Sequence, residues 1–290
     1  MPELPEVETV ARGVDQRVRG ERIDAVWFGS HHEPFKTPAA IQAQRLDGLF
    51  LLGVHRTGKH IVCELGPEKP VKARAKSKDN KDNDSLVPTA QWIVHLGMTG
   101  RLLVTTADAP VVVHTHARLT LASGRELRFV DPRRFGRLEF RDLNRSESFQ
   151  AAGADPLLIG KDEFAALFRG RKLVIKAALL NQSLLSGVGN IYADESLFHA
   201  GIRPRRMAGR LKLAELERLR LALRQVLEDS IRLGGSSVSD YVDANGVRGF
   251  YQLQHCVYLR TGEPCRSCQS PIQRVIVAGR GTHFCLQCQH

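Results

Sequence analysis

Two pairs of closely spaced cysteines near the end of the chain constrain its fold more than any other feature. Cys265 and Cys268 form one pair, Cys285 and Cys288 form the other, and 16 residues separate the pairs. Each pair can place two thiolates on one metal ion, and four thiolates complete a tetrahedral zinc site with no open position for chemistry. We therefore expect one structural Zn²⁺ in this module.

The residues between the two cysteine pairs predict a small hairpin. Gln273–Val277 and Thr282–Phe284 have the pattern of two short strands, joined by a tight turn over residues 278–281 with Arg280 at its tip. So short a segment does not fold without its metal. The zinc is expected to hold the hairpin that presents Arg280, and a rigidly presented arginine suits a phosphate. By itself the module indicates only contact with nucleic acid.

The rest of the sequence favours a cytoplasmic protein with reduced thiols. No apolar run approaches the ~20 residues that span a membrane. The first six residues, MPELPE, lack the basic start and the apolar stretch of a signal peptide. In a reducing compartment the paired cysteines favour zinc over two disulfides. Cys63 and Cys256 stand alone in apolar, strand-like contexts, and both are predicted to be small core residues.

The charge balance indicates a polyanionic partner. The 290 residues include 42 Lys and Arg against 31 Asp and Glu, a net charge of +11. Nucleic acid is the commonest partner of such a surface, and a generally basic protein is the alternative. A chain of this length is expected to form two domains and a small appendage.

Hydrophobic periodicity divides the chain into two halves. Residues 5–19 predict a helix, because Pro5 suits its first position and apolar residues fall on one face. Short strands separated by turns follow up to about residue 140, which indicates antiparallel sheets. The clearest of them are residues 50–54, 60–65, 91–96, 101–105, 117–121 and 126–130, with a hairpin turn at 122–125.

Helical periodicity replaces this pattern from about residue 153. The expected helices are residues 161–168, 172–182, 190–200 and 213–233. Residues 236–251 form a long loop, which in a compact domain is usually functional or disordered. Residues 67–88, rich in Lys, Arg, Asp, Asn and Ser, predict a flexible surface insertion.

Five segments carry a resemblance to a known family. They are Pro2–Glu6, His95–Gly100, Asp131–Gly136, Gly187–Ala193 and the cysteine module with Arg280. In this order, over nearly the whole chain, they resemble the bacterial formamidopyrimidine-DNA glycosylases, the purine-directed branch of a family that includes endonuclease VIII. Leu4 and Val7 look more like the purine-directed branch than like endonuclease VIII.

The resemblance implies an α+β fold in three parts. Residues 2–145 would form a catalytic, β-sandwich-like domain with a helix at its start, interrupted by the insertion at 67–88. Residues 150–250 would form a helical DNA-binding domain with a helix–two-turn–helix element and a lesion-recognition loop at 236–251. Residues 256–290 would form the zinc finger.

The N-terminus also suggests chemistry of its own. Removal of Met1 leaves Pro2 as a secondary amine with a reference pKa of about 8. Such an amine can attack an electrophilic sugar carbon and form an iminium, or Schiff base, which acidifies the neighbouring proton and leads to strand scission. Glu3 adjoins the amine and can act as a general acid or base. The alternative is that both residues merely begin a helix.

The resemblance assigns roles to further residues. The implied catalytic residues are Pro2, Glu3, Lys59 and Arg280, and the implied DNA contacts are His95, His114, Asn190 and a member of the pair Arg171 and Lys172, together with Met98, Arg133 and Phe135. Asn190, at a helix start, would grip a phosphate with its side chain and the backbone N–H groups. Met98, Arg133 and Phe135 would fill the gap left when the damaged base is flipped out.

The resulting hypothesis is a bifunctional DNA-repair enzyme. It would excise oxidised purines from damaged double-stranded DNA through an N-terminal proline Schiff base and cut the strand by β,δ-elimination, acting as a monomer. Two alternatives remain: an endonuclease VIII-like glycosylase for oxidised pyrimidines, and a non-catalytic zinc-ribbon protein that binds nucleic acid.

Overall fold

The computed structural model describes residues 1–30, 34–68, 87–238 and 241–290. These residues form two compact units. Unit 1 contains residues 1–2, 7–150 and 239–248, and unit 2 contains residues 3–6, 151–238 and 249–290. Within the described part of the chain, no helix is both long and apolar enough to cross a membrane.

The first helix, α1, covers Leu4–Val18, one residue earlier than the sequence indicates. Val7, Val10, Val14 and Val18 recur at helical spacing, and each is at most 1% exposed. This buried stripe makes the helix a central part of the core of unit 1, as expected from its periodicity.

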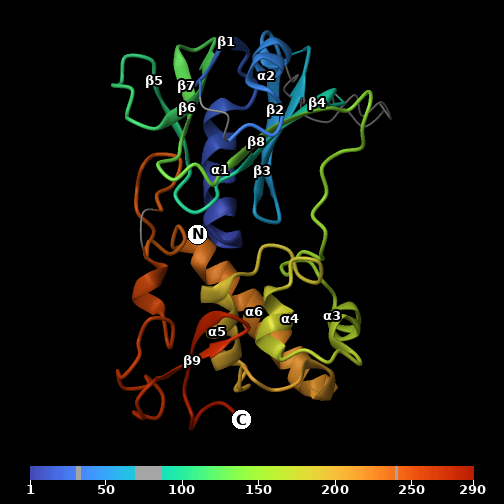
Figure 1. Ribbon diagram of the computed structural model, residues 1–290, viewed down its shortest axis with the longest axis vertical. Coiled ribbons are helices and arrows are strands. Elements are labelled where there is room, and N and C mark those ends of the chain that lie inside the picture. The colour runs from blue at the N-terminus through green and yellow to red at the C-terminus, as the bar shows by residue number, and fades with distance from the viewer. Residues whose placement is uncertain (31–33, 69–86, 239–240) are drawn as a thin grey trace, which may run out of the picture. The chain divides into compact units, whose positions relative to one another are not determined.

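Unit 1 contains two antiparallel four-stranded sheets (Figure 1). The first sheet has the order β1, β6, β7, β5, and the second has the order β2, β3, β4, β8. The strands are β1 (Ile23–Phe28), β2 (Phe50–Thr57), β3 (His60–Gly66), β4 (Ala90–His95), β5 (Arg101–Thr106), β6 (Thr115–Leu121), β7 (Arg125–Val130) and β8 (Arg137–Asp142).

One hydrophobic cluster joins α1 to both sheets, with Trp92 of β4 and Phe129 of β7 among its fully buried members. A short helix that the sequence analysis does not predict, α2 (Ala39–Leu46), lies beside it. Its buried Gln42 accepts a hydrogen bond from the Trp92 indole N–H at 3.0 Å. Gln42 supplies the partner that a buried indole requires.

The loop at 236–251 is divided between the units, whereas the sequence analysis assigns all of it to the helical half. Residues 239–248 belong to unit 1. There Ala244 is buried in the core, and its C=O accepts the N–H of Val104 at 3.0 Å. Residues 69–86, most of the expected insertion at 67–88, lie outside the described residues, as do 239 and 240.

Unit 2 is mainly helical. Its α-helices are α3 (Lys161–Phe168), α4 (Ile175–Leu180), α5 (Asn190–His199) and α6 (Leu213–Arg232), with short 3₁₀ turns η1 (Ala208–Arg210) and η2 (Tyr251–Gln254). Helix α4 is shorter than the expected 172–182. Val174 pairs with Met207 in an isolated β-bridge, so the chain before Ile175 is extended.

The zinc module contains the expected hairpin of β9 (Gln273–Val277) and β10 (Arg280–Phe284). Arg280 pairs with Val277, so the turn consists of Ala278 and Gly279 alone, both with positive φ (50° and 72°). This is the geometry of a two-residue hairpin turn. The expectation that Arg280 stands at the tip is therefore wrong, because it opens β10, where it is exposed.

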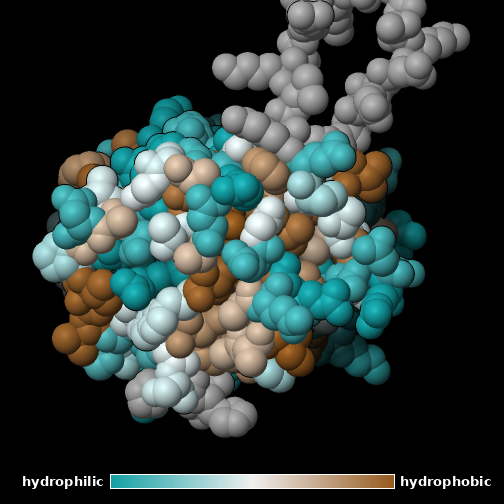
Figure 2. Space-filling view, turned by 90° about the horizontal axis from the view of Figure 1, so that it is seen from above, coloured by the Kyte–Doolittle hydropathy of each residue, from teal (hydrophilic) through white to brown (hydrophobic). Residues whose placement is uncertain are grey.

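The fold class expected from the sequence is confirmed: N-terminal antiparallel sheets with a first helix, a helical region and a C-terminal hairpin. The face seen in Figure 2 intersperses hydrophilic side chains with small hydrophobic areas.

Candidate catalytic and DNA-binding site

The four paired cysteines come together as the sequence analysis expects. Their sulfur atoms all lie within 4.8 Å of one another. Sγ of Cys265 is 3.8 Å from that of Cys288, and Sγ of Cys268 is 3.4 Å from that of Cys285. Four thiolates at these separations fit one tetrahedral Zn²⁺, which leaves no position for a substrate. The metal is structural, and the prediction of a zinc site is confirmed.

A buried ion pair under the hairpin fixes β10 to the helices. Lys176 of α4 is fully buried, and its Nζ lies 2.6 Å from Oδ1 of Asp194 in α5. The same Nζ donates to the C=O of Gly281 at 3.1 Å and to Oγ1 of Thr282 at 2.8 Å. Burial lowers the pKa of Lys176, and the charge of Asp194 opposes that shift. The bonds to Gly281 and Thr282 satisfy the remaining donors of Lys176, which helps a buried ion pair to persist.

Asp194 and Asn190, both from α5, complete this attachment. Oδ2 of Asp194 accepts the backbone N–H of His283 at 2.8 Å. Nδ2 of Asn190 donates to the C=O of Gly281 at 2.9 Å. The strand that carries Arg280 is thus positioned by two helices of unit 2. The local sequence pattern does not indicate a role for Lys176 or Asp194.

Glu3 lies at the N-terminus of α5. Its carboxylate accepts the backbone N–H groups of Ile191 at 3.1 Å and of Tyr192 at 3.5 Å, and the residue is 4% exposed. The positive end of the helix dipole favours an anion at this place. A Cβ on Gly189 would lie 2.1 Å from Cδ of Glu3, so only glycine leaves room for the carboxylate.

This arrangement differs from the one expected for Asn190. The backbone N–H groups of Ile191 and Tyr192 already bind Glu3, and the side-chain N–H of Asn190 already binds Gly281. In this arrangement these donors hold protein groups at the start of α5.

Glu6 is the centre of a second buried network. Oε2 of Glu6 accepts the N–H of Glu3 at 2.9 Å, and Oε1 accepts the N–H of Ser236 at 2.7 Å and the hydroxyl of Tyr192. Complete burial, together with the charge of Glu3, raises the pKa of Glu6 to about 7. The network connects the residue after Pro2 with the start of the 236–251 loop. In the sequence, Glu6 is recognised only as the last residue of the N-terminal motif Pro2–Glu6.

Pro2 and Lys59 belong to unit 1. Pro2 is buried, and only Glu3 stands between it and the start of α1. Lys59 forms, with Gly58 (φ 62°), the two-residue turn between β2 and β3. Its charge contributes to the low pKa of His95, about 4, which is caused first by burial and then by the charges of His60 and Lys59. The His95 ring lies against the His60 ring, tilted by 47°, with 4.8 Å between the ring centroids.

The three residues expected to fill the gap in DNA lie on two loops that pack together. Met98 is 39% exposed and Phe135 is 49% exposed. The guanidinium of Arg133 lies 4.7 Å from the centroid of the Phe135 ring. Unit 1 therefore presents Met98 and Phe135 at its surface, with Arg133 next to Phe135.

Buried Asp131 holds the two loops together. Oδ1 accepts the hydroxyl of Thr99 at 2.6 Å, and Oδ2 accepts the N–H of Gly136 at 2.8 Å. A Cβ on Gly97 (φ 63°) would lie 2.5 Å from the backbone of residues 135 and 136. Asp131 opens the sequence motif Asp131–Gly136, but the sequence indicates no role for it.

The remaining expected DNA contacts lie in two places. His114 is exposed with φ of 68°, and its C=O accepts the N–H of Asp131 at 3.0 Å. Arg171 and Lys172 are exposed in the loop between α3 and α4 of unit 2.

The two single cysteines have different environments. Cys63 is fully buried in β3, as expected, and burial raises the pKa of its thiol. Cys256 is only half-buried, with its Sγ 3.8 Å from Nε2 of His199. The prediction of a core position for Cys256 is wrong, because its segment after η2 is irregular and borders a cavity.

Comparison with known families accounts for most of the chain. Residues 1–138 match the formamidopyrimidine-DNA glycosylase N-terminal domain, residues 153–242 match the H2TH domain of the same glycosylase, and residues 262–290 match the zinc finger found in FPG and IleRS.

Full-length relatives and solved structures agree with these matches. The chain is 42% identical to a formamidopyrimidine-DNA glycosylase of Solibacter usitatus and 39% identical to one of Thioalkalivibrio sulfidiphilus, covering 99% and 100% of those proteins. It resembles the Lactococcus lactis enzyme in complex with Fapy-dG DNA (TM-score 0.82, 32% identity, 99% of both chains). It also resembles the MutM (Fpg) protein of Thermus thermophilus (TM-score 0.80, 36% identity, 99% and 98% of the chains).

Proposed function

The chain belongs to the formamidopyrimidine-DNA glycosylase family, and we propose that it removes oxidised purines from DNA during base excision repair. The expected substrates are 8-oxoguanine and formamidopyrimidines in double-stranded DNA. Base removal is followed by cleavage of the strand through β,δ-elimination.

The reaction begins at Pro2. After removal of Met1, the secondary amine attacks C1′ of the damaged nucleotide and the bond from C1′ to the base breaks. The amine then releases its proton, and an iminium forms as the bond from C1′ to the sugar ring oxygen breaks. Loss of a C2′ proton then breaks the bond to the 3′ phosphate, and a second elimination breaks the bond to the 5′ phosphate. Lys59 assists the eliminations as a base and phosphate ligand, and Arg280 binds the phosphate beside the lesion.

Glu3 supplies the proton that opens the sugar ring. The observation that carries this proposal is the position of its carboxylate, adjacent to Pro2 and held by the N–H groups of Ile191 and Tyr192. A general acid must be fixed near the atom it protonates, and two backbone donors restrict this side chain to one orientation.

DNA binding supports the chemistry in two ways. Met98, Arg133 and Phe135 occupy the gap left by the flipped nucleotide, with the apolar side chains between base steps and the arginine on the orphaned base. The second contribution comes from phosphate contacts and the net charge of +11. The proposed phosphate ligands are His95, His114, Arg171 or Lys172, and Asn190. Because Asn190 binds Gly281 in this structure, its contact requires a change of partner.

We further propose that the protein acts as a monomer in the bacterial cytosol, where DNA binding keeps it with the nucleoid. The sibling endonuclease VIII activity remains the second candidate, because one similar structure is a complex of the Lactococcus lactis enzyme with DNA that contains an oxidised pyrimidine.

An uncleaved N-terminal extension tests the proline mechanism. It converts the Pro2 nitrogen into an amide, so excision and borohydride trapping on an abasic-site oligonucleotide should both be lost. Binding to an abasic analogue should persist, because the phosphate ligands are unchanged. Excision at the unmodified rate would refute the mechanism, and a native protein that is never trapped would favour a non-catalytic zinc ribbon. A panel of 8-oxoguanine, formamidopyrimidine and thymine glycol duplexes separates the two glycosylase activities.

A further inference from the structure

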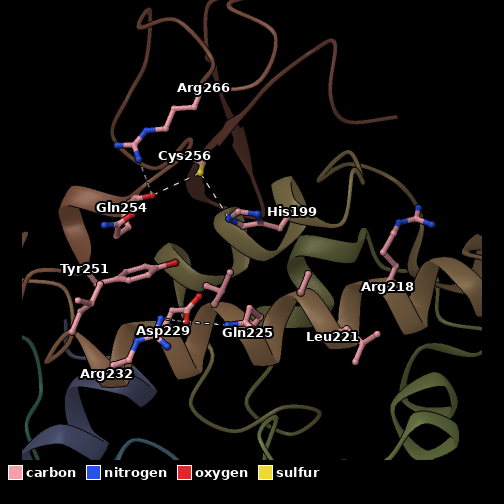
Figure 3. A pocket seen from close by; sticks show the side chains of 13 residues that line it. His199, Arg218, Leu221, Gln225, Asp229, Arg232, Tyr251, Gln254, Cys256 and Arg266 are labelled. Atoms are coloured by element: carbon pink, nitrogen blue, oxygen red, sulfur yellow. Dashed lines mark hydrogen bonds and ion pairs between the residues drawn. The ribbon is translucent and has the colours of Figure 1, made fainter.

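Unit 2 contains a cavity that the proposed reaction does not use. Its volume is about 690 Å³, and α5, α6, η2 and the chain entering the zinc module surround it (Figure 3). His199, Gln225, Asp229, Gln254, Cys256 and Arg266 contribute to its wall.

Three different metal-binding side chains come together beside this cavity, and two of them, His199 and Cys256, line its wall. Glu195, His199 and Cys256 each place a ligand atom within 4.8 Å of the other two. Glu195 and His199 are four residues apart on α5, which puts them on the same face of the helix. Cys256 comes from the segment after η2, and Figure 3 shows its sulfur facing the His199 ring.

The separations suit a borderline-soft divalent ion. Zn–S and Zn–N bonds of about 2.3 and 2.0 Å put tetrahedral sulfur and nitrogen ligands roughly 3.5 Å apart. Sγ of Cys256 is 3.8 Å from Nε2 of His199. His199 is exposed, so rotation of its side chain can close the remaining gap. Thiolate, imidazole and carboxylate are all ligands that zinc accepts.

Glu195 is already fixed in place. Its buried carboxylate accepts the N–H groups of Cys256 at 2.8 Å, Val257 at 3.0 Å and Tyr258 at 2.8 Å. A carboxylate has about four lone-pair positions, so these three bonds leave one for a metal. The same contacts hold the backbone of Cys256 next to α5, which makes two of the three ligands pre-organised.

We propose that Glu195, His199 and Cys256 bind a second, exchangeable Zn²⁺. Three protein ligands leave the fourth position open toward the cavity, unlike the closed site of four cysteines. Arg266, whose guanidinium donates to the C=O of Leu253 at 2.9 Å, lies on the same cavity wall and weakens the binding of a cation. The ion would therefore be held less tightly than the structural zinc.

Such an ion would join two segments that matter for DNA repair. Helix α5 begins with Asn190 and carries Asp194, and Cys256 lies nine residues before the first zinc ligand, Cys265. Binding at this point couples free zinc to the stability of the attachment between α5 and the zinc module, by the usual linkage of ligand binding to the folded state.

Metal content of the full-length protein tests the proposal. After equilibration with buffered free Zn²⁺, we expect two ions per chain in the unmodified protein and one in Cys256→Ala and His199→Ala. Gln225→Ala, which changes the same cavity wall but no ligand, should still hold two. Loss of an outer-shell partner typically weakens metal binding by roughly 10–100-fold. Removal of either ligand should raise the Kd of the second zinc by more than this.

Cobalt gives an independent readout of the thiolate. Co²⁺ added to protein whose four-cysteine site is already loaded with zinc should produce a sulfur-to-cobalt absorption band, which Cys256→Ala lacks. Retained excision activity of the variants shows that they fold, because neither residue has a catalytic role here. A single zinc in the unmodified protein at saturating Zn²⁺, or a second zinc that persists without Cys256 and His199, would overturn the proposal.

Discussion

At the scale of single residues, Glu3 shows how a side chain gains a role from its surroundings. Many proteins begin a helix with a glutamate, but this carboxylate is bound by the first N–H groups of a different helix, α5. Its position is therefore determined by the fold of unit 2 and by one covalent bond to Pro2.

Glu3→Gln should separate the two steps of the reaction. The amine remains, but the proton donor is lost, so excision of 8-oxoguanine should fall by about 100-fold or more. Cleavage of a preformed abasic site should change little, because no base has to be expelled. Single-turnover assays on the two substrates measure this, with Glu163→Gln, an exposed glutamate of α3, as the control. Equal losses on both substrates would contradict the assignment.

Glu6 should make stability depend on pH. Its folded-state pKa of about 7 lies above the ordinary 4.5, so the folded protein keeps a proton that the unfolded chain releases. Stability from this group is present at low pH and is lost as the pH rises from about 4.5 through 7, by at most about 3 kcal/mol. Urea midpoints between pH 5 and 8 should fall more steeply for the unmodified protein than for Glu6→Gln. Parallel profiles would disprove the shift.

The roles of residues could be predicted from the sequence where their chemistry depends on near neighbours in the chain. The four zinc cysteines are defined by their spacing, and Pro2 and Glu3 are adjacent. Lys176 and Asp194 could not be found in this way, because they are 18 residues apart and acquire meaning only when β10 packs on them.

At the scale of elements, the turn before α5 requires glycine. Gly189→Ala would place a methyl group 2.1 Å from Cδ of Glu3 and displace the carboxylate. Excision should fall by roughly 100-fold, the expected cost of misplacing a catalytic group by about 1 Å. Gly160→Ala is the matched control, since Gly160 also precedes a helix, has φ of −73° and has nothing within 4 Å of its added Cβ. Excision assays should show a loss only for Gly189→Ala, and equal activity of the two variants would refute the close contact.

The packing of the two loops around Asp131 should depend on the hydroxyl of Thr99. Thr99→Val keeps the shape but removes the 2.6 Å hydrogen bond to Asp131, which frees the loop that carries Met98. Leaving the buried carboxylate oxygen of Asp131 without this partner costs about 1–3 kcal/mol of folding free energy. We expect kcat/KM on lesion duplexes to fall about 10-fold for Thr99→Val and to stay near the original value for Thr99→Ser, which keeps the hydroxyl. Two equally impaired variants would rule out the hydrogen bond as the cause.

Elements with strong periodicity could be predicted closely. The periodicity places α1 and α6 within one residue of their observed ends, and the expected Lys161–Phe168 coincides with α3. Helix α2 could not be predicted in this way, because one of its two buried residues, Gln42, is polar and the other, Leu46, gives no apolar period alone. Arg280 was misplaced because hairpin register depends on the positive φ of Ala278, which is unusual for a residue other than glycine.

At the scale of the whole molecule, zinc should support more than the hairpin. Cys265→Ser with Cys288→Ser should release the structural ion and unfold β9 and β10. The Lys176–Asp194 pair then loses its partners Gly281, Thr282 and His283, which leaves a buried charge pair incompletely satisfied. We expect weaker DNA binding and also a lower thermal midpoint for the helices of unit 2, followed by circular dichroism. An unchanged helical midpoint would show that the attachment contributes nothing.

The fold class could be predicted from the sequence, but the division of the chain between the two units could not. Composition and periodicity indicate a strand-rich half and a helical half. The division of residues 236–251 between the units depends on Ala244 packing into the distant core and on its hydrogen bond to Val104, contacts that no local pattern encodes.

The buried pair under β10 also has a consequence for biosynthesis. Lys176 leaves the ribosome 105 residues before Gly281, so at about 5–20 residues per second it waits for roughly 5–20 seconds without its final partners. In a chain that ends before β10, Lys176 and Asp194 would lack their partners in that strand. We therefore expect truncated products to unfold and be degraded. A protein that binds damaged DNA but lacks Arg280 would then not accumulate in the cell.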